Sequence, residues 1–303
     1  MRVVFNAVWI FAQVRTKKFS FGRERNYAST DFVNALLELL NAYYHSFLNV
    51  LMVLVIAFVA FAWLEKMFTF SEREKSIRAN LLDLQYVGLA ILFPPTIYFV
   101  IAYLFNALAI HLHTVMIHPD LSPAKWIGEF LLYLFVRDIL IYARHRIFHT
   151  QKVWPFHSIH HSSEDVNWIS AARFHPLESG IESTGEILLF LIAANFGMDY
   201  NVLSVASTVI GFYNLFVHAN IKWSFGPLDY IFVSPIFHRW HHSDAPAAHD
   251  KNFAAMFSCL DLLLGTFYLP KNELPDTLGL SPEEKKIHPR SLWRQLVYPF
   301  KKN

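Results

Sequence analysis

The sequence predicts an all-α integral-membrane protein, a transmembrane helix bundle with a cytosolic-side helical cap that carries clustered histidines. Hydrophobic residues make up 54% of the 303 residues and charged residues only 17%, against roughly 25% charged in an ordinary soluble domain. Phenylalanine occurs 29 times and glycine 10 times, which favours an outer surface that meets lipid. The chain has 16 histidines, and five of them fall between positions 145 and 161.

The composition argues against several classes of protein. The net charge is only +2, and no basic tract is interleaved with aromatic residues as a nucleic-acid groove requires, so we expect no nucleic-acid partner. A single cysteine, Cys259, cannot form an internal disulfide and implies no oxidising compartment.

Residues 1–46 are expected to form an N-terminal basic or interfacial segment. The apolar stretch 3–14 is followed by five basic residues. It has some character of a signal peptide, but no small-residue cleavage site follows cleanly. Residues 47–64 are uncharged and long enough to span a bilayer. They begin the expected membrane-embedded domain, residues 47–270, which a polar C-terminal tail, 271–303, follows.

Further apolar segments continue this domain. Pro94 and Pro95 should kink or break the second of them. The last two segments, 187–196 and 202–217, should form a helical hairpin. The first of them is too short to span the bilayer unless the preceding glutamate-bearing turns join it. An excess of Lys and Arg is expected on the cytosolic side, but this number of apolar segments places the basic N-terminal arm on the other side if the histidines face the cytosol. Either residues 3–14 also enter the membrane, or the double-proline segment does not fully cross it. The apolar segments are residues 84–110, 126–143, 187–196 and 202–217.

Three histidine boxes are the main candidates for chemistry. One HxxxH motif directly continues the segment 126–143, and two HxxHH motifs follow it. Spacings of three and four residues place imidazoles on one face of a helix. Two such clusters could surround a pair of metal ions, although imidazole suits iron, zinc, copper and nickel alike. Isolated histidines are better explained as ordinary polar or core residues. The boxes are His145 and His149; His157, His160 and His161; and His238, His241 and His242.

The order of these boxes in a hydrophobic chain resembles the fatty acid hydroxylase and sterol desaturase superfamily. The sequence segments around the boxes support this resemblance. Residues 160–167 (HHSSEDVN) and 250–253 (DKNF) are similar to the alkylglycerol monooxygenase branch, and residues 173–178 (RFHPLE) look like the sterol desaturase branch. The resemblance covers roughly residues 126–270.

The resemblance implies a non-haem di-iron enzyme that uses O2 to hydroxylate or desaturate an unactivated C–H bond of a sterol, acyl or ether lipid taken from the bilayer. Electrons would come from a separate donor of the reductase, ferredoxin or cytochrome b5 type. The centre would face the cytosol from a bacterial inner membrane or the endoplasmic reticulum, and zinc could replace iron in purified protein. The implied metal ligands are the eight box histidines and the isolated His218.

Further residues are candidates around this centre. Asp138, seven residues before His145, is expected to hydrogen-bond to a ligand imidazole; an ion pair with a neighbouring arginine is the alternative. Some relatives have a further histidine where this chain has Asn214, whose side-chain oxygen we expect to point at the metals unless it bonds to backbone. His175 is expected to contact the substrate, with a role as a metal ligand as the alternative. Glutamates 178, 182 and 186 form either a solvated face or the wall of a passage.

The competing hypothesis is a non-enzymatic membrane protein, either a haem carrier or a divalent-metal transporter. A haem carrier needs histidine pairs that face one another across helices at membrane depth. A transporter would bury its polar groups near the bilayer midplane. Boxes gathered just outside the apolar segments favour the enzyme.

Overall fold

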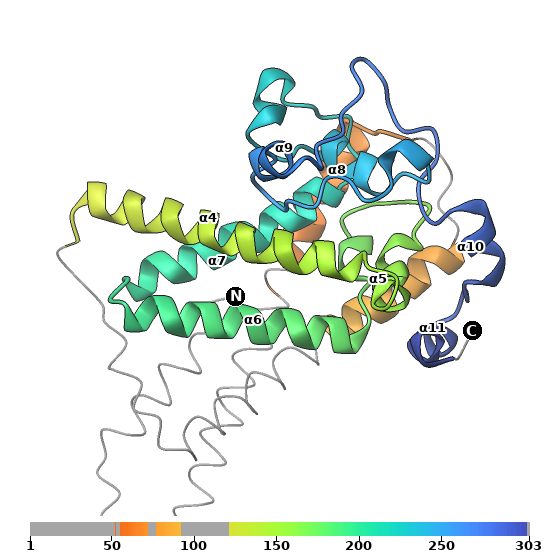
Figure 1. Ribbon diagram of the computed structural model, residues 1–303, viewed down its shortest axis with the longest axis horizontal. Coiled ribbons are helices and arrows are strands. Elements are labelled where there is room, and N and C mark those ends of the chain that lie inside the picture. Colours follow the sequence, from red (N-terminus) through yellow and green to blue (C-terminus); the bar gives the residue numbers. More distant parts are fainter. Residues whose placement is uncertain (1–51, 53–54, 72–76, 92–120, 302–303) are drawn as a thin grey trace, which may run out of the picture.

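The computed structural model describes residues 52, 55–71, 77–91 and 121–301. These residues form helices joined by loops (Figure 1). Within the described ranges there is no β-strand, and pairing is limited to two isolated bridges, Thr69–Ile221 and Ser243–Leu278. The predicted all-α class is therefore confirmed for this part of the chain. The predicted segment 1–46 and the proline break at 94–95 lie outside it.

Three long helices form the base of the fold (Figure 1). They are α4 (Pro123–Phe148), α6 (Pro176–Asn195) and α7 (Tyr200–His218). Tyr133 and Leu134 of α4 pack with Phe190 of α6 and with Leu203 and Ile210 of α7 in one buried cluster. The predicted segment 126–143 lies inside α4, and the predicted hairpin is formed by α6 and α7. The glutamate-bearing turns do extend the first arm, because α6 begins at Pro176.

Local sequence signals explain where these helices begin and how the hairpin turns. The carboxylate of Asp199 accepts hydrogen bonds from the backbone N–H of Asn201 (2.8 Å) and Val202 (3.2 Å) at the start of α7. Such a cap satisfies donors that have no partner within the helix. Gly197, between the two helices, has φ of 85°, a left-handed conformation that favours glycine.

Shorter helices lie against one end of this base (Figure 1), and two of them carry the second and third histidine boxes. The segment after residue 270, predicted as a polar tail, packs against them: the backbone N–H of Gly279 donates to the carbonyl of His242 over 2.8 Å. Residues 55–67 and 77–91 are also helical. The shorter helices are α5 (Trp154–His161), α8 (Pro235–His241), α9 (Cys259–Leu264), α10 (Pro282–Ile287) and α11 (Leu292–Val297), with 3-10 turns at Ser170–Ala172, Gly226–Tyr230, Pro246–Ala248 and Tyr298–Phe300.

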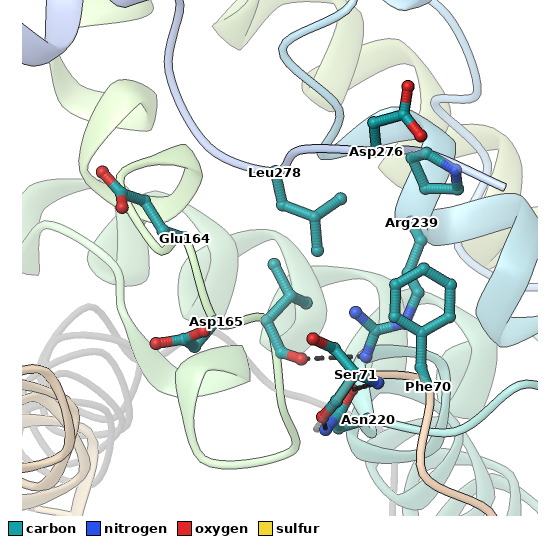
Figure 2. A pocket seen from close by; sticks show the side chains of 10 residues that line it. Phe70, Ser71, Glu164, Asp165, Asn220, Arg239, Asp276 and Leu278 are labelled. Carbon is teal, nitrogen blue, oxygen red and sulfur yellow. Dashed lines mark hydrogen bonds between the residues drawn. The ribbon is translucent and has the colours of Figure 1, made fainter. Parts of the chain in front are cut away.

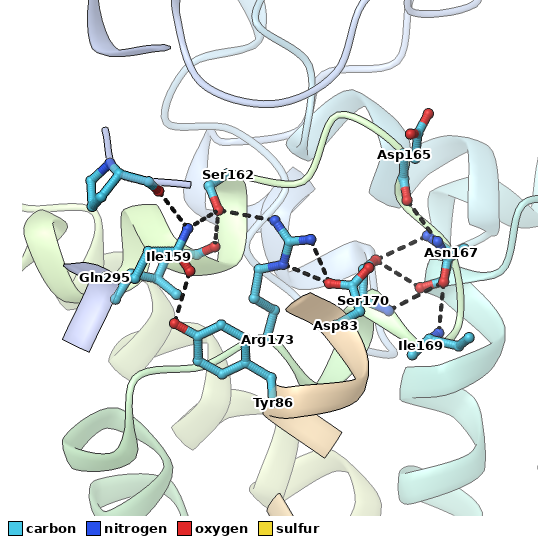
Figure 3. Close-up of polar contacts among 11 residues, drawn as sticks. Asp83, Tyr86, Ile159, Ser162, Asp165, Asn167, Ile169, Ser170, Arg173 and Gln295 are labelled. Carbon is cyan, nitrogen blue, oxygen red and sulfur yellow. Dashed lines mark hydrogen bonds and ion pairs between the residues drawn. The ribbon is translucent and has the colours of Figure 1, made fainter. Parts of the chain in front are cut away.

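A buried polar network joins the helical residues 77–91 to this layer (Figure 3). The guanidinium of Arg173 donates to Asp83 over 2.6 Å and to the Ser162 hydroxyl, just after α5, over 3.1 Å. Gln295 of α11 donates to the same hydroxyl and accepts from the Tyr86 hydroxyl over 2.9 Å. Segments far apart in the sequence are thus held around one arginine.

Apolar side chains also cover the outside of the long helices. Among the residues that the structure describes, α7 is the one helix that is both long and apolar enough to cross a membrane. Large hydrophobic residues on α4 and α6 are exposed, among them Leu131, Leu132, Ile139, Leu140, Ile181, Leu188 and Ile192. An exposed apolar surface of this extent is a feature of interfaces with protein or membrane.

The Asp83–Arg173 pair gives a test of the network. We expect Asp83→Ala to lower the free energy of unfolding by about 3–5 kcal/mol, because it leaves a buried guanidinium without its carboxylate. The measurement is the melting temperature of the purified full chain. In the double variant Asp83→Ala, Arg173→Met, much of the loss should be recovered, since no uncompensated charge remains. Equal melting temperatures for Asp83→Ala and the unaltered protein would contradict this account.

Candidate metal centre

The three boxes and His218 are carried by helix ends that converge. His145 lies in the last turn of α4 and His149 at its C-cap, while His218 is the last residue of α7. The second box occupies α5, and the third occupies the end of α8 with His242 at its C-cap. Proline opens both short helices, and the Ser234 hydroxyl caps α8 by accepting from the N–H of Phe237 over 3.2 Å. The boxes are therefore helical, as predicted from their spacing.

The nine histidines named from the sequence come together as two adjacent groups. Within each group, one ring nitrogen of every residue lies within 4.8 Å of the others. Seven of the nine side chains are buried and two are half-buried. The first group is His145, His149, His157, His161 and His241; the second is His160, His218, His238 and His242.

Hydrogen bonds fix the protonation of rings in the first group. Nδ1 of His145 bonds to the carbonyl of Phe253 (2.8 Å), and Nδ1 of His241 bonds to the carbonyl of Lys251 (2.7 Å). Nδ1 of His157 bonds to a carboxylate oxygen of Glu178 over 2.5 Å. Carbonyl and carboxylate oxygens only accept, so each Nδ1 must carry the hydrogen and each Nε2 presents a lone pair.

The consequence is a close approach of lone pairs. Nε2 of His145 lies 3.1 Å from Nε2 of His157, although both are committed as acceptors. Nε2 of His241 is buried without a hydrogen-bond partner, as are those of His149 and His161. Buried acceptors without a donor are costly. A cation between them would remove that cost.

The second group repeats this pattern. Nδ1 of His218 donates to the carbonyl of Asn214 over 2.7 Å, so its Nε2 is an acceptor. This atom lies 3.2 Å from Nε2 of His160 and 3.0 Å from Nε2 of His238, which in turn is 3.1 Å from Nε2 of His242. Nitrogens bound to one metal ion at about 2.1 Å and at right angles are about 3.0 Å apart. The donor set therefore fits a metal ion in each group.

Burial keeps these rings in the form that can bind metal. It lowers the pKa of the imidazoles on α5 and α8 well below their usual value, and neighbouring imidazoles lower it further. At pH 7 the rings are neutral, so no proton competes for the lone pairs. This holds for His157, His160, His161, His238, His241 and His242.

Asp138 does not make the predicted contact. Both its oxygens accept from backbone N–H groups of a loop, those of Ala255 (2.9 Å), Met256 (3.2 Å) and Phe257 (2.6 Å). The prediction of a hydrogen bond to a ligand imidazole is wrong, and so is the alternative of an ion pair with a neighbouring arginine. The carboxylate is instead satisfied by a loop that the sequence places more than 110 residues away.

The role predicted for Asp138 is taken by Glu178, which is 1% exposed and bonded to His157. The interpretation of glutamates 178, 182 and 186 as a solvated face is wrong. Glu182 pairs with Arg144 (2.6 Å) and Glu186 with Arg137 (2.5 Å). The signal in the sequence was that the glutamates, one turn apart, share one face of a helix, and that the two arginines, two turns apart, share one face of another.

The two other predicted residues, His175 and Asn214, lie in different surroundings. His175 caps the start of α6, where its Nδ1 accepts from the N–H of Leu177 and its Nε2 donates to the carbonyl of Leu296. It is not among the described residues that line the cavity beside the histidines, and its contact with substrate stays a prediction. Asn214 does line that cavity, and its backbone carbonyl holds His218.

Arg239, inside the third box, faces away from the metal groups and fixes the box to its surroundings. Its guanidinium donates to the carbonyls of Val166 and Ala219, both over 2.8 Å, and lies 4.4 Å from the ring centre of Phe70. Figure 2 shows Arg239 and Phe70 among the side chains that line a small cavity, whose volume is about 40 Å³. Since Ala219 follows His218, this single side chain sets the position of α8 relative to the end of α7.

Two cavities reach the histidines. One, of about 180 Å³, lies among α4, α6 and α7; its walls include Leu134, Ile141, Phe148, Ile210 and Val217 as well as the glutamates and arginines described above. The other, of about 360 Å³, is lined by His149, His161 and His241 together with Trp154, Asp250 and Glu284. The two cavities have no lining residue in common.

The two groups predict separable metal losses. We expect His161→Ala to remove the ion of the first group and His238→Ala that of the second, so that each variant keeps about half of the bound metal, because each group supplies its own nitrogens. Elemental analysis of purified protein measures this. His249→Ala, an exposed neighbour, is the control and should keep all of it. Full metal content in both site variants would disprove the assignment.

The Glu178–His157 contact predicts an effect on affinity. Glu178→Gln keeps a hydrogen-bond acceptor but loses the charge that makes the imidazole more basic. Metal affinity, measured by competition with a chelator, should fall by about 10–100-fold. Glu182→Gln is the matched control on the next turn of α6; it should leave metal affinity unchanged because Glu182 bonds to Arg144 instead. A loss of equal size in both variants would rule out a specific action through His157.

Comparison with known proteins adds to this geometry. The family model for fatty acid hydroxylase matches residues 130–266. The chain is 32% identical over 187 residues to the ornithine lipid hydroxylase OlsE of Rhizobium tropici, covering 60% of this chain and 54% of the relative. It is 29% identical over 183 residues to the alkylglycerol monooxygenase of Caenorhabditis elegans, covering 58% and 34%. For the C-4 methylsterol oxidase of Schizosaccharomyces pombe the identity is 28% over 153 residues, covering 49% and 50%.

The chain spans about half or less of the length of these curated relatives. No solved structure is significantly similar to it. The match covers α4 to α9, the elements that carry the histidines. Residues 130–266 are therefore similar to the fatty acid hydroxylase family, and the resemblance to that superfamily and to its alkylglycerol monooxygenase branch is confirmed.

Proposed function

We propose that this chain is an O2-dependent di-iron enzyme that hydroxylates or desaturates a membrane lipid at an unactivated C–H bond. The observation that carries the proposal is the pair of adjacent groups of imidazoles, five and four in number and most of them buried, beside a cavity whose lining includes several apolar side chains. The family match and relatives whose names describe lipid oxidation support the class of reaction.

The nine histidines would hold two iron ions, which supply the activation of O2 and the oxidation of the C–H bond. The protein's own task is to orient and to exclude water. Carbonyls of Lys251, Phe253 and Asn214 hold three rings by their Nδ1–H groups, so that each lone pair keeps its direction. Leu134, Ile141 and Val217 line the cavity and keep water from the carbon that reacts.

Asp138 and Asn214 are assigned supporting roles in this proposal. Asp138 positions the loop that contains the Phe253 carbonyl and therefore acts on His145 through two hydrogen bonds. The Asn214 side chain, half-buried in the wall of the cavity, would offer its amide oxygen to the second group, directly or through a water.

The membrane location belongs to the same proposal. Exposed leucines and isoleucines of α4 and α6, together with the apolar α7, support insertion of the long helices in a bacterial inner membrane or the endoplasmic reticulum. The short helices would then face the cytosol. The cavity beside Trp154 gives a second approach to the centre for O2 and for a separate electron donor of the reductase, ferredoxin or cytochrome b5 type.

The competing hypothesis, a haem carrier or a divalent-metal transporter, accounts for less of the geometry. Haem needs axial ligands that face one another across the width of a porphyrin, whereas ring nitrogens here approach to 3.0–3.2 Å. A transport path needs weak sites along a route. Nine buried nitrogens gathered at one place favour retention of metal instead.

A comparison of lipids tests the function. Cells that express the intact chain should contain a lipid heavier by one oxygen or lighter by two hydrogens than its precursor, formed only in the presence of O2. Cells that express His241→Ala, His242→Ala should lack that product, because both metal groups lose a nitrogen. Mass spectrometry of total lipids is the measurement. An unchanged product in the double variant, or an intense Soret band in the purified protein, would overturn the proposal.

A further inference from the structure

We propose that the cavity of about 360 Å³ beside Trp154 is the port through which a divalent metal ion enters the first histidine group from solvent, and that the carboxylates of Asp250 and Glu284 attract the ion there. The second group does not open to this port, so its ion exchanges more slowly. The port rests on the proposed function, because it serves the metal centre assigned there.

The two histidine groups open to different cavities. His149, His161 and His241 line the larger cavity, and all three belong to the first group. No histidine of the second group is among the described residues that line it. Three histidines of the second group line the smaller cavity among α4, α6 and α7 instead. An ion that arrives through the larger cavity therefore meets the first group.

The histidines at the larger cavity hold nitrogens that await a ligand. Nε2 of each of His149, His161 and His241 is buried without a hydrogen-bond partner. The residues His161 and His241 are each only 4% exposed. None of the three is among the described residues around the smaller cavity. The larger cavity is therefore the approach that the described structure offers to these three nitrogens.

Charge at the larger cavity favours a cation. Asp250 and Glu284 line it, whereas no lysine or arginine does so in the described part of the chain. Asp250 bonds to the imidazole of His149, and Glu284 accepts from the indole N–H of Trp154, so neither carboxylate is used up by an arginine or lysine. The smaller cavity, by contrast, has two arginines on its wall. A cleft lined by charge of one sign speeds the arrival of ions of the opposite sign by about 10–1,000-fold.

The carboxylates lie next to the first ligands that an entering ion would meet. Oδ1 of Asp250 is 3.2 Å from Nδ1 of His149. Glu284 holds the indole of Trp154 over 2.6 Å, and the centre of that ring system lies 5.0 Å from the ring of His149 and 5.2 Å from that of His161. A water molecule takes about 30 Å³ in the liquid, so the cavity has room for an ion with several waters. Imidazoles suit iron and zinc better than carboxylates do, and transfer to the rings is therefore downhill.

Uptake of cobalt(II) by the metal-free full chain in detergent tests the port. Cobalt bound by imidazoles absorbs visible light, so its arrival can be followed by stopped-flow absorbance, and its release can be followed after addition of excess EDTA. The unaltered chain should take up cobalt in a fast and a slow phase. His238→Ala, which removes a nitrogen of the second group, should keep the fast phase and lose the slow one.

Amide substitutions separate attraction of the ion from retention of the ion. Asp250→Asn and Glu284→Gln remove the charges but keep hydrogen-bond acceptors for His149 and Trp154. In the double variant, fast uptake should slow by about tenfold or more and lose most of its dependence on ionic strength. Carboxylates that only held the bound ion would leave uptake unchanged and make release faster. Glu283→Gln is the matched control, because Glu283 is exposed on α10 beside Glu284 but does not line the cavity; it should leave uptake unchanged.

Salt provides a second measurement that needs no substitution. Fast uptake by the unaltered chain should slow as ionic strength rises, and this result decides the matter if the melting temperature shows that the double variant is not folded. Uptake that is insensitive to salt, loss of the fast phase in His238→Ala, an equal slowing in Glu283→Gln, or no uptake of cobalt overturns the port. A chain that takes up ions as expected but oxidises no lipid would instead defeat the proposed function alone.

Discussion

The close approach of neutral imidazoles governs much of this structure. Nε2 atoms of rings from four helices converge to 3.0–3.2 Å, and those of His145, His157 and His218 are lone-pair acceptors because their Nδ1 atoms donate elsewhere. Lone pairs do not assemble unaided, since each loses its water on burial and gains no partner. Every ring must therefore be held from its other side, and the surrounding elements supply those contacts.

A short segment between α8 and α9 supplies several of them. The carbonyls of Lys251 and Phe253 each hold one imidazole, while two buried aspartates bind its backbone N–H groups. Asp261 binds those of Phe253 and Ala254, and Asp138 binds the next three. A loop whose donors are fixed by carboxylates keeps its carbonyls in place. The ring of His145 is thus positioned by a residue seven positions earlier on its own helix, through a loop distant in sequence.

Charge on the two sides of the centre is distributed differently. On the side of the long helices, glutamates and arginines pair across α4 and α6 and form one wall of a cavity. On the other side, Trp154 and Asp250 line a separate cavity next to His149. In the proposed function, the first cavity would receive the lipid and the second the small polar reactants.

The sequence by itself determined the periodic and the local features. Apolar runs predicted the helices and the hairpin, and box spacing predicted which eight histidines share a face with their neighbours, because both follow from the pitch of one helix. The ninth, His218, was named from the family resemblance. Only the tertiary structure decided the partners. Asp138 meets a loop, Glu178 takes the contact expected of Asp138, and His175 caps a helix away from the cavity. The contacts of the two carboxylates join residues 21 to 119 positions apart, and no local pattern encodes which distant group a buried carboxylate will reach.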